Sequence, residues 1–287
     1  MKTYPRILST LCLIGLISHS PLWAETTTTN SEQVPIISKN LTENTIIVYF
    51  NLYDETVADK ESSETYRKLL KVNNDGSYLV QDFYSKTDNQ LTSPMTLKKA
   101  QDLTVNYLHL KDLDGTILYS NEDGSKMLEK TFKNGKVEGT LTRWNKAGQK
   151  NYEAHYKDNK LEGVVYSWHD NGKKASESHF KNGKLDGKTI NWNELGNKKQ
   201  EANYKAGKQD GVTTHWYEGK NQKLYETHYK DGNRDGLHTT WYENGQKKSE
   251  ENYKNDMLDG LSTSWDENGH KEYEINYKED RPLDSTR

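Results

Sequence analysis

The sequence is poor in cysteine and in long apolar segments. Cys12 is the only cysteine among 287 residues, and it lies inside an apolar stretch near the start of the chain. After that stretch no thiol remains for a disulfide, a thiolate nucleophile or a cysteine metal site. No later segment approaches the roughly 20 apolar residues that a membrane-spanning helix needs. We therefore expect no transmembrane segment, and stability must come from backbone pairing and side-chain packing.

Aliphatic side chains are scarce as well. Hydrophobic residues make up only 31% of the chain, a fraction close to that of disordered proteins, yet 19 Tyr and 7 Trp are present. Disordered chains contain few aromatic rings. The composition therefore predicts a thin, elongated fold with a narrow core.

Sequence motifs of catalysis are missing. The chain contains no HExxH, GxSxG, P-loop or GxGxxG motif. An excess of positive charge is missing too, because the formal net charge is −3. This charge opposes general binding to nucleic acids and to anionic lipid surfaces. We therefore expect a protein that is not an enzyme, needs no cofactor and binds no nucleic acid.

The first 24 residues have the features of a secretory signal. Lys2 and Arg6 give a basic start, an uncharged and mostly apolar stretch follows, and Ala24 is a small residue at a cleavage position. Cys12 lacks the small residue immediately before it that a lipoprotein signal requires. We therefore expect cleavage near Ala24 and export, without a lipid anchor, to the periplasm or the medium. Residues 25–44 are expected to form a flexible leader.

A tryptophan returns every 24 residues through the second half of the chain, with one extra residue before the fifth copy. A Gly lies five residues before each Trp, and a Glu lies three residues before each member of an aromatic column. The Trp column is Trp144, Trp168, Trp192, Trp216, Trp241 and Trp265, and the aromatic column is Phe132, Tyr156, Phe180, Tyr204, Tyr229, Tyr253 and Tyr277. A fixed period of this length indicates an array of structural repeats.

Each repeat contains two turn signals, such as Asn134-Gly135 and Ala147-Gly148. Two turns in each period leave two strands of about 6–8 residues, so the repeat unit is a β-hairpin. We therefore predict an all-β fold, an elongated antiparallel ladder of hairpins over residues 108–287 that ends in a C-terminal cap.

Residues 45–107 lie before the clear repeats and form a divergent N-terminal segment. Residues 46–52 and 78–84 are rich in β-branched and aromatic side chains, which predicts strands. Residues 62–72 between them are compatible with a short helix. The segment is therefore expected to be a small α+β or β unit.

Side chains alternate between the two faces along a strand. Val164, Tyr166 and Trp168 face one way, and on the second strand of a hairpin Tyr152 and Tyr156 share one face. We expect the Trp side to be buried, with the Trp column and the aromatic column packed over one another as the core of the array. Burial of these rings, at about 25 cal/mol per Å² of apolar surface, is the main stabilising contribution that we expect.

The pattern after Gly236 resembles the bacterial MORN-repeat variant, a β-hairpin module related to the eukaryotic membrane-occupation-and-recognition-nexus repeat. It reads Trp241-Tyr242-Glu243-Asn244-Gly245-Gln246-Lys247 and continues with Glu250, Tyr253 and Lys254. The resemblance extends over residues 108–277. It implies a ladder of hairpins, and proteins with this repeat are often described as antitoxin or immunity partners of secreted toxins.

One polar constellation recurs on the face opposite the aromatic column, where each second strand carries Glu, then His or Asn, then Lys. The candidate binding residues are Glu153, His155, Lys157, Glu177, His179, Lys181, Glu201, Asn203, Lys205, Glu226, His228 and Lys230. One interpretation is a charged stripe that binds a repetitive partner such as a glycan, a peptidoglycan strand or an extended peptide. The other, which we favour, is that opposite charges on neighbouring strands set the register and keep the face soluble.

The histidine column does not predict a metal site. Equivalent positions in successive hairpins are two strand spacings apart, about 9.5 Å, whereas a zinc ligand lies about 2 Å from the ion. A second candidate, for loosely bound calcium, is the acidic column Glu138, Glu162, Asp186, Asp210, Asp235 and Asp259. An acid before Gly is ordinary turn chemistry, and calcium needs about six converging oxygens. We therefore expect no metal.

These observations favour an exported scaffold or recognition protein that presents an extended repeat surface to a protein or to an envelope polymer. The resemblance adds an alternative, an immunity protein that neutralises one secreted toxin. The expected signal peptide fits a periplasmic immunity protein better than an antitoxin in the cytoplasm. Both functions stay open at this point.

Overall fold

The structure is a computed structural model that describes residues 41–283. The expected signal peptide and leader, apart from residues 41–44, lie outside the described residues. The described part belongs to one compact unit and contains two antiparallel β-sheets with two short 3-10 helices. Between residues 41 and 283 there is no α-helix, and no helix has the length and apolarity that crossing a membrane requires. The prediction of an all-β fold is confirmed.

The first sheet has five strands in the order β2-β1-β3-β4-β5. Its elements are β1 (Ile46–Phe50), β2 (Thr56–Val57), β3 (Thr65–Val72), β4 (Tyr78–Tyr84) and β5 (Met95–Leu97), followed by the 3-10 helices η1 (Ala100–Thr104) and η2 (Tyr107–His109). The strands predicted at 46–52 and 78–84 are confirmed. The helix considered at 62–72 is wrong, because this segment pairs with both β1 and β4 and buries Tyr66 and Leu69 between them.

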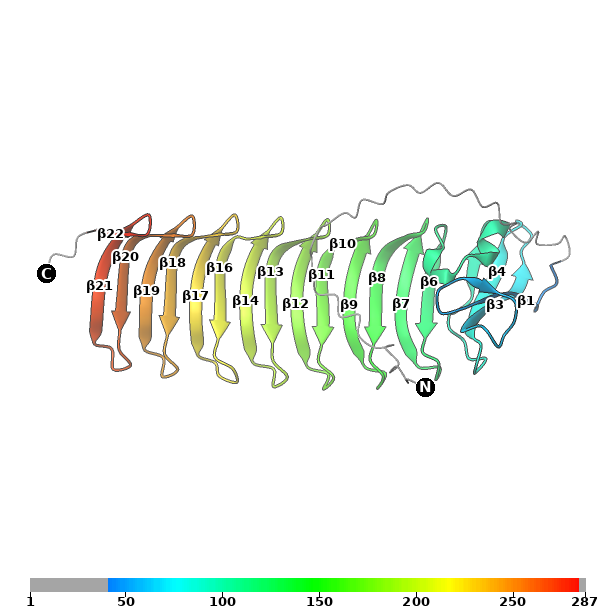
Figure 1. Cartoon of the computed structure of the whole chain (residues 1–287), viewed down its shortest axis with the longest axis horizontal. Helices are drawn as coiled ribbons and strands as arrows, with labels where there is room; N and C mark the ends of the chain where they lie inside the picture. The colour runs from blue at the N-terminus through cyan, green and yellow to red at the C-terminus, as the bar shows by residue number, and fades with distance from the viewer. Residues whose placement is uncertain (1–40, 284–287) are drawn as a thin grey trace, which may run out of the picture. The chain divides into compact units, whose positions relative to one another are not determined.

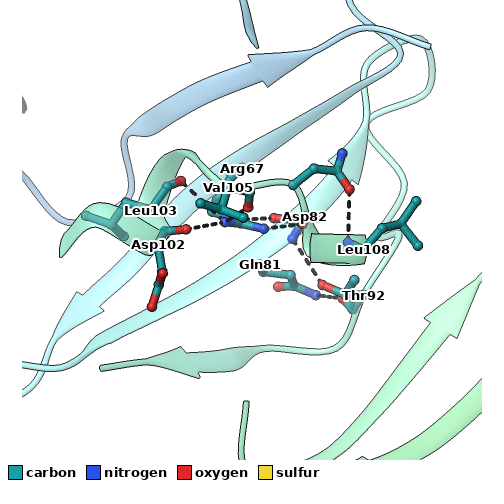
Figure 2. Close-up of polar contacts among 9 residues, drawn as sticks. Arg67, Gln81, Asp82, Thr92, Asp102, Leu103, Val105 and Leu108 are labelled. Atoms are coloured by element: carbon teal, nitrogen blue, oxygen red, sulfur yellow. Dashed lines mark hydrogen bonds and ion pairs between the residues drawn. The ribbon is translucent and has the colours of Figure 1, made fainter. Parts of the chain in front are cut away.

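A buried ion pair holds this small sheet together (Figure 2). Arg67 on β3 and Asp82 on β4 are 0% and 1% exposed, and the guanidinium donates two hydrogen bonds to the carboxylate at 2.7 and 2.8 Å. The third nitrogen donates to the backbone oxygen of Val105 at 2.7 Å, which fixes the segment after η1. Gln81 donates to the backbone oxygen of Thr92 at 2.8 Å. These bonds satisfy charges that burial would otherwise leave unpaired.

Residues 91–93 connect the first sheet with the second. The amide of Ser93 donates to Leu118 O at 2.7 Å, and the amide of Ser120 donates to Leu91 O at 2.8 Å. Leu118 and Ser120, which make these bonds from the second sheet, both lie in its first strand, β6 (Gly115–Ser120). The free edge of β6 is therefore covered, which protects it from pairing with other chains.

The second sheet is the predicted hairpin ladder, and its strands lie in a row in chain order (Figure 1). Within the described residues β6 pairs with β7 and β22 with β21, and no strand pairing joins β6 with β22, so these two strands are the ends of the row. After β6 the strands are β7 (Lys126–Lys133), β8 (Lys136–Trp144), β9 (Lys150–Lys157), β10 (Lys160–Leu161), β11 (Gly163–Trp168), β12 (Lys174–Lys181), β13 (Lys184–Trp192), β14 (Lys198–Lys205), β15 (Lys208–Gln209), β16 (Gly211–Trp216), β17 (Lys223–Lys230), β18 (Asn233–Trp241), β19 (Lys247–Lys254), β20 (Met257–Trp265), β21 (Lys271–Lys278) and β22 (Arg281–Leu283). Strands β10 and β11 both pair with β9, and β15 and β16 both pair with β14, so each is one strand in two pieces.

The two sheets differ in how they bury apolar surface. Large aliphatic side chains that are almost completely buried, such as Leu69, Met95, Leu103 and Leu113, belong to the first sheet and its connection to β6. In the ladder beyond β6 the buried apolar side chains are few, namely Leu141, Ala154, Val165 and Ala202. Backbone pairing therefore carries a larger share of stability in the ladder than in the first sheet.

The Trp column and the aromatic column lie on opposite faces of the ladder. Tyr166 is the cross-strand partner of Glu177, whereas Gly163 is the partner of Phe180. Directly opposed residues share a face, so the Trp side is also the side of the Glu-His-Lys stripe. We call these surfaces the Trp face and the Tyr face. The prediction that the two columns pack over one another is wrong. The predicted alternation within each strand is correct, but the register between neighbouring strands places the two columns on opposite faces.

Each residue of the aromatic column lies opposite one of the repeat glycines. Tyr204 pairs with Gly187, and Tyr253 pairs with Gly236. Gly187 and Gly236 have φ values of +113° and +111°, a left-handed region that L-residues rarely adopt. The atoms nearest to a Cβ at Gly187 or Gly236 belong to the side chains of His179 and His228, at 3.1 Å. The constant spacing of Gly and aromatic residues in the sequence therefore reflects their pairing across neighbouring strands.

We predict that Gly236→Ala destabilises the ladder more than Gly172→Ala. Both positions have positive φ, but a Cβ at Gly236 would lie 3.1 Å from the Cβ of His228, whereas a Cβ at Gly172 would meet nothing within 4 Å. We expect Gly172→Ala to cost about 1 kcal/mol from backbone strain and Gly236→Ala about 1–3 kcal/mol. Urea unfolding of the two variants measures the difference, and equal losses would contradict the close contact.

Candidate interaction surface

A β-bulge shapes the Trp face in every clear repeat. Ser167 pairs with Ser176 and Trp168 pairs with Lys174, so Ala175 is an extra residue on β12. Residues three apart on a regular strand point to opposite faces. The extra residue brings Lys174 to the same face as Glu177, and the ammonium nitrogen lies 2.8 Å from a carboxylate oxygen. The bulge therefore allows an ion pair that the spacing of the two residues in the sequence does not predict.

The same ion pair recurs along the ladder at nitrogen–oxygen distances between 2.5 and 2.8 Å. Its members are Lys150–Glu153, Lys174–Glu177, Lys198–Glu201, Lys223–Glu226, Lys247–Glu250 and Lys271–Glu274. The carboxylate side chains are 21–43% exposed. Partly exposed pairs of this kind contribute about 0–1 kcal/mol each. The Glu residues of the predicted stripe are therefore engaged within the ladder.

Four of these lysines, and Lys126 one repeat before them, also reach into the next repeat. The ammonium of Lys150 lies 5.9 Å from the ring centroid of Trp168, and that of Lys174 lies 5.5 Å from Trp192. Equivalent contacts join Lys126 with Trp144, Lys198 with Trp216 and Lys223 with Trp241. A cation over an indole face is attracted by the ring quadrupole. The Trp column is thus half-buried and interleaved with lysines, and this contact links neighbouring hairpins.

Glu201 has a more crowded environment than the other carboxylates of the stripe. Lys188 and Lys198 both donate to it, at 2.5 and 2.6 Å. These two ammonium groups, Lys188 first, lower the pKa of the Glu201 carboxyl below its ordinary value. The carboxylate form is therefore held in place on the Trp face.

The His and Asn positions of the stripe have a structural task in the described ladder. Nδ1 of His179 lies 2.9 Å from Lys188 O, and Nδ1 of His228 lies 2.8 Å from Leu237 O. In the next repeats Asn203 and Asn252 donate through Nδ2 to the equivalent carbonyl oxygens, at 2.8 and 2.9 Å. The acceptor is a carbonyl, so the His rings carry their hydrogen on Nδ1. His and Asn alternate here because each places one donor at the bulge around the repeat glycine.

His155 and the lysines at the strand ends differ from this pattern. His155 Nδ1 lies 3.2 Å from the hydroxyl of Thr140 rather than against a bulge carbonyl. Lys157, Lys181, Lys205 and Lys230 are exposed at the ends of β9, β12, β14 and β17. The structure thus places all twelve candidate residues on one face, and their role in binding a partner stays a prediction.

The acidic column ties each hairpin to the next one. Glu138, Glu162 and Asp186 accept hydrogen bonds from the amides of Asp158, Asn182 and Ala206, at 2.9, 2.8 and 3.0 Å. These donors lie at the first tip position of the turn in the following repeat. Carboxylates with such amide partners do not converge on one point, and no cluster of three or more His, Cys, Asp or Glu side chains suited to a metal occurs within 41–283.

The second tip residue of each of these turns completes the link between repeats. Gly183 donates its amide to Leu161 O at 2.8 Å, and Gly207 donates to Leu185 O at 2.7 Å. Where Asn159 or Asp256 replaces the glycine, the amide makes the same bond and the side chain adds a second. The oxygen of Asn159 accepts from the amide of Val137 at 2.6 Å, and that of Asp256 accepts from the amide of Arg234 at 2.8 Å.

The opposite edge of the ladder is tied by side chains. Tyr217 and Tyr242 donate through their hydroxyl groups to the backbone oxygens of Trp241 and Trp265, at 2.8 and 3.0 Å. Nε2 of His169 lies 3.0 Å from Trp192 O. An open, polar hollow at this edge is lined by Trp168, His169, Asp170, Asn171 and Glu194. Both edges therefore fix the spacing of the hairpins.

The Tyr face carries a cluster that sequence reasoning missed. The His215 and Tyr225 rings stack at 4.3 Å, His238 lies 5.9 Å from Tyr225, and Tyr253 lies 6.1 Å from His238. Burial lowers the pKa of both histidines. His215 and His238 take the places that Asn191 and Thr213 hold one repeat earlier. The sequence signal for this cluster is a histidine at repeat positions where the neighbouring repeats have another residue type.

Three segments of the chain match the model of the MORN repeat variant: residues 161–182, 234–255 and 258–279. Each matched segment begins in the first strand of a hairpin and runs through the second strand to the following turn. No curated protein matches the chain. The resemblance in the sequence is thus supported at three positions, and the described structure shows the same pairing pattern in the hairpins between and before them.

We predict that His179→Asn leaves stability nearly unchanged, because Asn203 fills the equivalent place in the next repeat with the same bond. His179→Leu removes the donor to Lys188 O and should cost about 0.5–1.5 kcal/mol. Denaturant unfolding of both variants gives the comparison. A Leu variant as stable as the Asn variant would show that the stripe position contributes no bond to the fold.

We predict that the free energy of unfolding falls as the pH drops below about 6.5, the ordinary pKa of histidine. Burial lowers the folded-state pKa of His215 and His238, so the unfolded chain binds these protons first and stability is lost as pH falls. Around His238 the facing groups are Thr227, Tyr225, Tyr253, Arg234 and Glu251, of which Glu251 opposes the shift.

The control for this prediction is a double variant, His215→Asn with His238→Thr, which uses the residues of a neighbouring repeat. Denaturant unfolding between pH 7 and pH 5.5 should show a smaller pH dependence in the variant than in the parent chain. An equal pH dependence would assign it to other groups.

Proposed function

We propose that the chain is an exported, non-enzymatic scaffold that binds another macromolecule, a protein or an envelope polymer, along its hairpin ladder. The observation that carries this proposal is the linkage of successive hairpins, by turn amides in every repeat at one edge and by side chains in several repeats at the other. These links hold the side chains of the Trp face and the Tyr face at a fixed interval. A partner with its own repeat, or an extended chain, meets the same groups again and again on such a surface.

The chemistry of the surface supports binding rather than catalysis. A catalytic site requires one asymmetric set of groups that converge in a pocket. The Glu and His or Asn residues of the Trp face recur in near-equal copies, and the structure gives them bonds within the ladder. Similarity to the MORN repeat variant supports the same reading, since it places the matched segments in a class of hairpin repeats.

Export rests on the first 24 residues alone, whose basic start and apolar stretch have the pattern of a signal. A protein sent to the periplasm or the medium meets envelope polymers, envelope proteins and secreted toxins. The proposal therefore includes the immunity function as a special case, in which the macromolecule is one toxin.

A pull-down from an envelope extract tests the proposal, with the chain from residue 25 onward as bait. Retention of one or a few macromolecules by the parent chain is the expected result. Wall fragments or outer-membrane proteins as prey support the scaffold, and one toxin-like prey supports the immunity function. Retention of no macromolecule from envelope or cytosolic extract contradicts the proposal.

We predict that Glu177→Gln, Glu201→Gln and Glu226→Gln together weaken retention of that prey while the fold persists. Each lost ion pair is worth only about 0–1 kcal/mol, so the thermal midpoint should shift little. Binding should also become less dependent on salt, because fewer charges take part. Unchanged affinity of the triple variant would exclude the glutamates of the Trp face from binding.

A further inference from the structure

Eight lysines face one another in pairs across four successive turns of the ladder. The cross-strand partners are Lys133 with Lys136, Lys157 with Lys160, Lys181 with Lys184, and Lys205 with Lys208. All eight side chains are exposed. Like charges directly opposite each other in a hairpin are destabilising. The turns nevertheless carry this arrangement four times in a row, and we call these eight residues the lysine ridge.

The ridge ends within the ladder. In the next three turns the second lysine is replaced, so that Lys230 pairs with Asn233, Lys254 with Met257 and Lys278 with Arg281. The charge of the ladder changes at the same place. Residues 115–210 contain 18 Lys and Arg against 13 Asp and Glu, whereas residues 211–283 contain 10 against 15. The paired lysines therefore belong to a basic half of an otherwise acidic protein.

Acidic residues near the ridge are already occupied. Glu138, Glu162 and Asp186 accept from turn amides, as described above. Within the described residues, one ion pair involves a lysine of the ridge, between Lys136 and Asp158 at 2.8 Å. Besides the hydrogen bond from Lys136, the charges of Lys157 and Lys160 also lower the pKa of Asp158. Besides the hydrogen bond from Lys98, the charge of Lys133 lowers the pKa of Asp114, so these carboxylates lie near the first two turns of the ridge. In the next two turns, the exposed side chains of Lys181, Lys184, Lys205 and Lys208 make no ion pair within residues 41–283.

Packing holds the second lysine of a turn in line with the next turn. A Cβ at Gly183 would lie 3.7 Å from the Cβ of Lys160, and one at Gly207 would lie 3.7 Å from that of Lys184. The start of each lysine side chain therefore lies against the glycine of the following turn. This contact orders the ridge along the ladder, with one lysine pair every two strand spacings, about 9.5 Å.

We propose that the lysine ridge binds an extended anionic polysaccharide that carries its charges at a regular, sparse interval. This inference rests on the proposed scaffold function and gives it a class of partner. Charge complementarity favours a polyanion, and the wide interval favours a glycan that is charged on alternate sugars. Double-stranded DNA carries one charge per about 1.7 Å, so most of its phosphates would find no lysine. Single-stranded nucleic acids rely on aromatic platforms beside the cations. The aromatic residue before the first lysine of each ridge turn, such as Tyr156 before Lys157, lies on the Tyr face, opposite to the face of that lysine.

The test uses hyaluronate, which has one carboxylate on every second sugar, as a fluorescent probe, with neutral dextran and a single-stranded oligonucleotide for comparison. The ridge variant carries Lys157→Gln, Lys160→Gln, Lys181→Gln and Lys184→Gln. The matched control carries Lys71→Gln, Lys146→Gln, Lys199→Gln and Lys254→Gln, four exposed lysines outside the ridge and outside the candidate binding residues, and so has the same net charge. Thermal unfolding of both variants establishes that they fold, and removal of like-charge pairs should not lower the midpoint of the ridge variant.

The parent chain should bind hyaluronate but not dextran, and affinity should fall as salt rises. The ridge variant should lose roughly tenfold in affinity with a weaker salt dependence, while the control stays within about twofold of the parent. Equal losses in both variants, binding of hyaluronate no tighter than dextran, or tighter binding of the oligonucleotide would each overturn the inference. The pull-down tests the scaffold function separately. If the chain retains a macromolecule from the extract but does not bind hyaluronate, the scaffold function is supported and only the proposed glycan partner is contradicted.

Discussion

The ladder depends on the hydrogen bonds that turn amides donate to the preceding repeat. A two-residue turn with positive φ at both tip positions, such as Asn182-Gly183, points its amides away from its own hairpin. Glu162 and Leu161 of the preceding repeat accept them. Unpaired amides at this place would cost stability, so the hairpins stack in one register. The spacing of every side chain on both faces follows from that register.

The two faces then take different roles. On the Trp face, lysines interleave with half-buried indole rings and pair with glutamates, so repeats are joined by contacts that do not need a thick apolar core. On the Tyr face, aromatic residues lie opposite glycines, and small residues such as Ala154 and Ala202 are completely buried. A chain with few aliphatic residues can build a ladder in this way because each hairpin contributes both kinds of contact to its neighbours. The first sheet, with its buried Arg67–Asp82 pair and aliphatic core, gives the ladder a conventionally packed start.

The sequence predicted the hairpin repeat because period, turn residues and alternation are local properties. It failed where the answer depended on register between strands. The register between neighbouring strands places the Trp and aromatic columns on opposite faces, and the extra residue Ala175 decides which face Lys174 takes. Neither is visible from alternation within one strand. The segment 62–72 became a strand because of partners far away in the sequence. The His and Asn column was located correctly, but its bond to a bulge carbonyl could be identified only once the bulge was known.

The turn amides at one edge all point back toward the N-terminal end of the ladder. A hairpin added after the last one would donate its turn amides to carboxylate and carbonyl oxygens of the present last hairpin. Loss of the last hairpin would expose only such acceptor oxygens, which water can satisfy easily. The covered edge of β6 offers no such freedom, because residues 91–93 occupy it. Duplication or deletion of single repeats is therefore tolerated best at the C-terminal end, and the number of hairpins is the property of this protein that evolution can change with the least disturbance to the rest.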